Sequence, residues 1–122
     1  MASEKRATGS FTVAIGSLTQ TLQGSFTGDL TGQPSSLRQQ IAAGSWQALQ
    51  LSAGLASIER IMVKNEDATN YVEFSYASDG TNPIAKVVKG DWFYIAPPAG
   101  TTAIYAQANT AACWISFNAC EP

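Results

Sequence analysis

The side chains in this sequence that could carry acid–base or metal chemistry are five carboxylates between residues 66 and 91, namely Glu66, Asp67, Glu73, Asp79 and Asp91. Two facing carboxylates can hydrolyse a glycosidic bond, and several carboxylates with loop carbonyls can hold calcium. Most of these five lie among turn-forming residues, where acidic groups serve solvation and capping, and their spacing matches no calcium-loop signature. We therefore expect no catalytic residue, no metal site and no cofactor.

The chain contains no histidine. This removes the commonest general base, the usual serine triad, the cysteine–histidine pair and the commonest transition-metal ligand. Two cysteines without histidine cannot complete a four-ligand zinc site in one subunit. No glycine-rich phosphate-binding loop is present. We expect a protein that is not an enzyme.

The two cysteines, Cys113 and Cys120, are seven residues apart. On one continuous strand they would face opposite sides about 23 Å apart, so a mutual disulfide would require a chain reversal between them. Cys113 lies in an apolar run and is interpreted as a small buried residue. Cys120 lies two residues from the C-terminus, which makes it a candidate for an intersubunit disulfide.

Composition indicates one globular domain: the chain has 122 residues, of which 45% are hydrophobic. Its net charge of −2, without a basic run, argues against nucleic-acid binding. No apolar run is long enough to cross a membrane, and the N-terminus does not resemble a secretory signal, so we expect synthesis in the cytoplasm. Only 13% of residues are charged, which suits a protein packed against neighbours; a neutral soluble domain is the alternative.

Alternating apolar residues predict strands along most of the chain. The N-terminal residues 1–9 are expected to form a flexible arm, residues 10–118 a single domain, and residues 119–122 a tail. Phe11, Val13 and Ile15 define a first strand that ends at Gly16-Ser17, and Leu18 to Phe26 is interpreted as extended. Further strands are expected at 37–41, 46–51, 58–64, 71–76, 84–88, 92–95, 104–108 and 113–117, with a loop at 30–36. Eight or nine short strands without a helix predict an all-β, antiparallel, jelly-roll-like sandwich.

Two turns organise the second half of the chain. Ser78 to Pro83, with Asp79-Gly80 near its centre, is the strongest turn signal. Lys89-Gly90 is a short turn, from which we expect Ile84–Val88 and Trp92–Ile95 to form a hairpin.

The run Trp92-Phe93-Tyr94-Ile95 is apolar on both faces of its predicted strand. Such a strand lies either between two layers or beneath a partner. The candidate interface residues are Trp92, Phe93, Tyr94, Tyr105 and Trp114. Trp46, Trp92, Tyr94, Tyr105 and Trp114 would alternatively provide a carbohydrate-binding platform, although aromatic residues in strands more often pack against neighbouring residues.

Three stretches resemble a group of small bacteriophage virion proteins: Val63–Glu73, Lys89–Phe93 and Tyr105–Ala112. The resemblance covers roughly residues 58–117 and ends in a "YAxANT" hairpin. It implies a non-enzymatic β-sandwich present in many copies in the virion, without a cofactor. The first expectation is a capsid decoration (cement) protein bound to the outer surface of the major capsid lattice. Its partners would be the major capsid protein and copies of itself, with a trimer favoured among homo-oligomers. A tail, fibre or head-spike component, or a carbohydrate-binding module, is the alternative.

Overall fold

The computed structural model describes residues 4–29, 34–51 and 55–121. The secondary structure of these residues consists of ten β-strands and the turns and loops that join them. They form no helix, and therefore none long and apolar enough to span a membrane. The chain divides into two compact units, Met1–Thr31 and Gly32–Pro122, which we describe separately. The strands are β1 (Glu4–Ile15), β2 (Leu18–Asp29), β3 (Pro34–Ile41), β4 (Gln47–Ala48), β5 (Arg60–Asn65), β6 (Val72–Ser75), β7 (Pro83–Val87), β8 (Trp92–Ile95), β9 (Tyr105–Ala108) and β10 (Cys113–Cys120).

The first unit is a single antiparallel hairpin of two 12-residue strands, β1 and β2. Its register is continuous from Glu4 opposite Asp29 to Ile15 opposite Leu18. Gly16 has a φ of 59° and is followed by Ser17, as in a type II′ turn, where glycine takes the first central position. The predicted break at Gly16-Ser17 and the extended segment after it are confirmed. The expected flexible arm is wrong from Glu4 onward, because regular cross-strand pairing extends that far; residues 1–3 lie outside the described residues.

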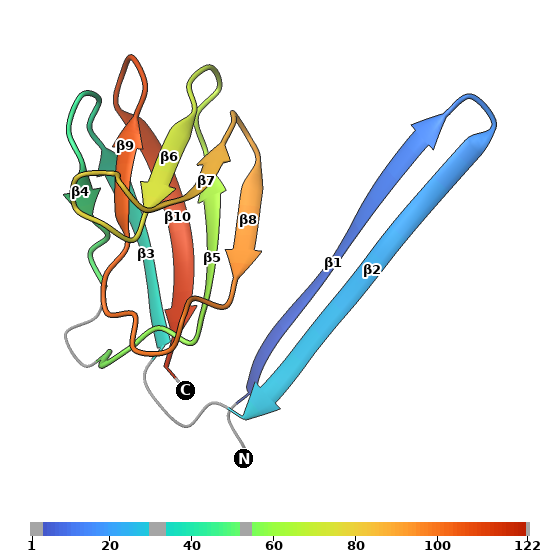
Figure 1. Ribbon diagram of the computed structural model, residues 1–122, viewed down its shortest axis with the longest axis horizontal. Helices are drawn as coiled ribbons and strands as arrows, with labels where there is room; N and C mark the ends of the chain where they lie inside the picture. The colour runs from blue at the N-terminus through green and yellow to red at the C-terminus, as the bar shows by residue number, and fades with distance from the viewer. Residues whose placement is uncertain (1–3, 30–33, 52–54, 122) are drawn as a thin grey trace. The chain divides into compact units, whose positions relative to one another are not determined.

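The second unit is a sandwich of two four-stranded antiparallel sheets (Figure 1). The first sheet has the order β3-β10-β5-β8, and the second has the order β4-β9-β6-β7. Successive strands alternate between the sheets except for β6 and β7, which pair directly. This is the double Greek-key arrangement of a jelly roll, so the predicted all-β, jelly-roll-like sandwich is confirmed.

The predicted hairpin of residues 84–88 with Trp92–Ile95 is wrong. β7 pairs with β6 in the second sheet, whereas β8 pairs with β5 in the first. Lys89-Gly90, with a φ of 70° at Gly90, is therefore a corner between layers. The "YAxANT" segment is likewise a crossover, since β9 and β10 lie in different sheets. Crossing between layers lets consecutive apolar strands bury their inner faces against one another.

The expected domain boundaries also differ from those of the structure. Residues 10–29 belong to the hairpin unit and not to the sandwich. β3 begins at Pro34, inside the expected loop at 30–36, and β10 continues to Cys120, inside the expected tail. Pro34 lies opposite Cys120 in the pairing of β3 with β10. The start of β3 and the end of β10 are therefore paired with each other beyond the expected bounds.

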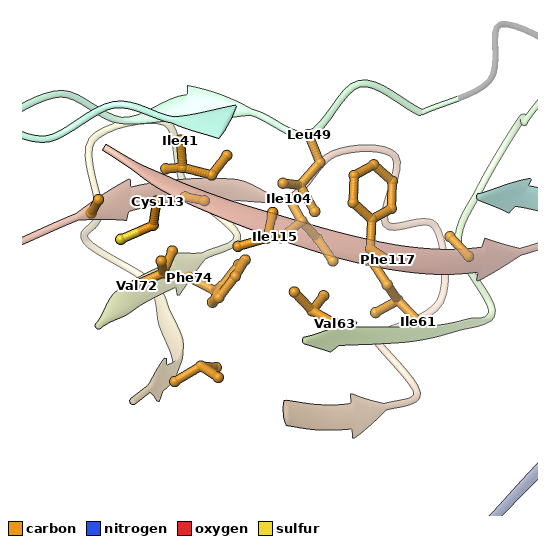
Figure 2. Packing of buried hydrophobic residues seen from close by; sticks show 14 of the residues in the cluster. Ile41, Leu49, Ile61, Val63, Val72, Phe74, Ile104, Cys113, Ile115 and Phe117 are labelled. Carbon is orange, nitrogen blue, oxygen red and sulfur yellow. The ribbon is translucent and has the colours of Figure 1, made fainter. Parts of the chain in front are cut away.

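The core of the sandwich consists of alternate residues from both sheets (Figure 2). Along β10, Cys113, Ile115 and Phe117 are buried while Trp114 is exposed. Phe74 of β6 packs edge-on against Phe93 of β8, with ring centroids 5.0 Å apart. Each fully buried side chain of this size stabilises the fold by roughly 1.5–3 kcal/mol. The core therefore fixes which face of each strand remains outside.

Candidate functional site

The outer face of the first sheet carries a group of exposed apolar side chains. Residues directly opposite on paired strands share a face. Ser116 lies opposite both Arg38 and Lys64, Lys64 lies opposite Trp92, and Met62 lies between Asn118 and Tyr94. Trp92 is 43% exposed, and Trp114 and Met62 are each 40% exposed. We call this surface the outer aromatic face; its residues are Arg38, Gln40, Met62, Lys64, Trp92, Tyr94, Trp114, Ser116 and Asn118.

Trp114 is held in place by a charged pair. The Arg38 guanidinium lies 4.3 Å from the centre of the Trp114 ring, and its Nε donates to Glu66 Oε2 over 2.6 Å. A cation over an indole face is attracted by the negative potential of the ring, and the carboxylate keeps the guanidinium oriented. One face of the Trp114 ring is therefore covered by Arg38.

The structure brings three of the five predicted interface residues together and separates the other two. Trp92, Tyr94 and Trp114 lie on the outer aromatic face. Phe93 packs into the core against Phe74, and Tyr105 is half-buried on β9 in the second sheet. Strand period two explains the position of Phe93, which alternates with Trp92 and Tyr94. Tyr105 is separate because β9 belongs to the second sheet.

Trp46 does not join the other tryptophans. It is only partly exposed, and its indole ring lies against Gly80 in the loop between β6 and β7. The proposed carbohydrate platform of Trp46, Trp92, Tyr94, Tyr105 and Trp114 is thus distributed over both sheets.

A shallow polar depression of about 260 Å³ lies at one end of the second sheet. It is lined by Tyr71, Glu73, Gln107, Ala108, Asn109 and Thr110. The Lys86 ammonium lies 4.1 Å from the centre of the Tyr71 ring, so one face of that ring is already occupied. Sequence reasoning did not identify this depression, because its residues come from two segments, 71–73 and 107–110, that are distant in the chain.

Two of the five carboxylates, Asp67 and Asp79, accept hydrogen bonds within their own turns. Asp67 Oδ2 accepts the backbone N–H groups of Asn70 and Thr69 at 2.6 and 2.9 Å, and these bonds, the Asn70 bond foremost, lower the pKa of Asp67. Asp79 accepts the Thr81 hydroxyl at 2.7 Å, which with the Thr81 N–H lowers the pKa of Asp79.

The remaining carboxylates do not converge on a common centre. Asp91 accepts the Trp92 N–H at 2.8 Å, Glu66 pairs with Arg38, and Glu73 lines the polar depression. Within residues 4–29, 34–51 and 55–121, no group of three or more acidic or cysteine side chains is placed to hold a metal ion.

The cysteines lie at opposite ends of β10 and are not joined to each other. Cys113 is buried, and its burial, with a smaller contribution from the negative charge of Asp67, raises the pKa of the thiol. Its interpretation as a small buried residue is confirmed. Cys120 is half-buried and lies opposite Arg60 and Pro34 in register; its intersubunit disulfide stays a prediction.

The three stretches that carry the phage resemblance all contain crossovers between the two sheets. Val63–Glu73 connects β5 to β6, Lys89–Phe93 leads into β8, and Tyr105–Ala112 leads from β9 towards β10. Their crossovers are bonded to one another at one end of the sandwich (Figure 1): the Asn65 N–H donates to Asp91 O at 2.9 Å, and the Thr110 hydroxyl donates to Asn70 Oδ1 at 2.7 Å.

Asn65 is the centre of this network. Its buried amide nitrogen donates to Asn70 O at 2.9 Å and to Val87 O at 3.0 Å, and its Oδ1 accepts the Asp67 N–H at 2.9 Å. The sequence places Asn65 in a polar turn cluster and does not reveal its burial. These motif residues therefore hold the crossovers together.

No known protein family, no curated protein and no solved structure matches this chain.

Proposed function

We propose that this protein is a non-enzymatic structural component of a bacteriophage virion, a capsid decoration protein that binds the outer surface of the major capsid lattice and stabilises it. The observation that carries the proposal is the outer aromatic face, where Trp92, Met62 and Trp114 are exposed on one side of a rigid sheet. Exposed apolar groups gathered on one face are typical of protein–protein contact surfaces.

The fold and the resemblance support the same function. The jelly roll occurs in viral capsid and lectin domains, which is an argument from analogy, since one fold hosts many functions. The resembling stretches build the crossover end of the sandwich. A rigid sandwich that presents apolar side chains on strands is suited to bridging capsid subunits, and many copies add their effect by multivalency.

The test uses particles that lack the protein and the purified full chain. We expect the chain to bind these particles and to stay bound when salt is raised to about 0.5 M, because apolar burial, unlike ion pairing, is not screened by salt. Trp92→Glu and Met62→Glu should each reduce affinity at least tenfold. Val88→Glu is the matched control, because Val88 is 47% exposed and follows β7 of the second sheet.

Two results would overturn the proposal. The first is equal binding by Trp92→Glu, Met62→Glu and the Val88→Glu control. The second is a copy number of a dozen or fewer per virion, measured by imaging intact particles, which would place the protein in the tail or a fibre. Hundreds of copies would support the capsid.

A further inference from the structure

The β1–β2 hairpin has one apolar face and one polar face. Because opposite residues share a face, Phe11 lies beside Leu22, and Val13 lies two positions further along the same side. Phe11 is 70% exposed and Leu22 is 76% exposed. The other face carries mostly serine, threonine and glutamine, with the Thr12 and Thr21 hydroxyls 3.0 Å apart across the strands.

Among residues 4–29 of its own unit, the apolar face of the hairpin has no second layer to bury it. A two-stranded hairpin is at best marginally stable in water, and a third strand or a second layer is needed for independent stability. In this unit the large side chains that such a layer would bury, at Phe11, Leu18 and Leu22, remain exposed. A second layer over this face would bury these side chains and stabilise the hairpin.

The central part of the hairpin carries no charge that would oppose pairing with a second copy. No charged residue occurs between Ala7 and Gly28, while Arg6 and Glu4 neutralise each other at the base with a 2.7 Å ion pair. Two such hairpins can approach face to face without like-charge repulsion. This segment offers no charged side chain that a partner could recognise by electrostatic attraction.

The shape of the face is also self-complementary. The Phe11–Leu22 pair forms a ridge, and the next pair on the same face is Gly9 opposite Gly24, which leaves a notch without side chains. A Cβ built on Gly24 meets no atom within 4 Å. A two-fold axis between ridge and notch sets the ridge of each copy into the notch of the other, which is the isologous geometry of a symmetric dimer.

We infer that two copies of the chain pair through the apolar faces of their β1–β2 hairpins, antiparallel and face to face, with each Phe11–Leu22 ridge in the Gly9–Gly24 notch of the other copy. The face is about 40 Å long and 10 Å wide from strand dimensions, so the pair buries roughly 800 Å². This is below the usual size of a stable interface, and association of the free protein is expected to be weak and concentration-dependent. The pairing has two-fold symmetry, in contrast to the trimer favoured from the resemblance. The inference does not depend on the proposed function.

The test is sedimentation equilibrium of the full chain over a wide concentration range. The wild type should change reversibly from monomer to dimer. Leu22→Glu should raise the dissociation constant at least tenfold, whereas Thr21→Glu, on the polar face, should leave it within about twofold. Gly24→Leu distinguishes the ridge-in-notch pairing from non-specific hydrophobic association. The leucine adds apolar surface but fills the notch, so the dissociation constant should also rise at least tenfold.

Gly24 is suitable for this test because its φ is not positive and leucine has higher strand propensity than glycine, so the substitution leaves the hairpin itself intact. Tighter association of Gly24→Leu than of the wild type would overturn the ridge-in-notch pairing. A wild type that stays monomeric at every concentration would overturn the inference altogether, whatever covers the face instead. A trimer as the end state would equally contradict it.

Discussion

The indole ring of Trp46 lies directly against the backbone of Gly80, so that a Cβ on Gly80 would stand 2.5 Å from the indole Cε2. Trp46 immediately precedes β4, at one edge of the second sheet, whereas Gly80 belongs to the loop between β6 and β7 at the other side. The contact therefore brings that loop across the sheet towards β4 (Figure 1). At the base of the loop, the Ser75 hydroxyl donates to Asn82 O at 2.9 Å.

Gly80→Ala should destabilise the protein more than Gly90→Ala. Both glycines have positive φ, 80° and 70°, and left-handed backbone costs an alanine about 1–2 kcal/mol. Only Gly80 adds a steric conflict with an aromatic ring, and overpacking costs a further 1–3 kcal/mol or so; around Gly90 there is open space. Urea unfolding of both variants gives the comparison. Equal losses of unfolding free energy would show that the Trp46 contact does not constrain the loop.

Asn65→Ala should lower the free energy of unfolding by about 2–4 kcal/mol. The substitution leaves Val87 O, Asn70 O and the Asp67 N–H without the side-chain partners described above, and buried polar groups without partners are costly. Asn118→Ala, at an exposed position on β10, is the matched control and should change stability by less than about 0.5 kcal/mol. Similar effects for the two variants, measured by chemical denaturation, would exclude a central role for Asn65.

The carboxylate of Asp67 should make stability depend on pH in the acid range. Its pKa in the folded protein is lowered by backbone hydrogen bonds from Asn70 and Thr69, relative to about 3.9 in the unfolded chain. The stabilisation is therefore fully present above the unfolded pKa and is lost as pH falls through the folded pKa. Asp67→Ala should show its largest deficit in unfolding free energy near pH 6, with the deficit shrinking below pH 4. A deficit that stays constant from pH 6 to pH 2 would contradict this linkage.

Local patterns predicted most strands but not their partners. Trp92 to Ile95 forms β8 within the predicted bounds, and the Ser78–Pro83 turn joins β6 to β7 as a hairpin, because alternation and turn-forming residues act over a few neighbouring positions. The similar Lys89-Gly90 signal predicted a hairpin that does not exist. A short turn and a corner between layers use the same residues, and only the burial of β7 and β8 in different sheets distinguishes them.

The sequence by itself determined an all-β chain without histidine, since strand period, turn chemistry and residue type can be read one segment at a time. The tertiary structure alone decided that Phe93 enters the core while Trp92 stays outside, that Asn65 is buried, and that residues 4–29 form a unit of their own. These features depend on which distant strands pair to bury the most apolar surface. That choice is made by the whole chain and not by any stretch of it.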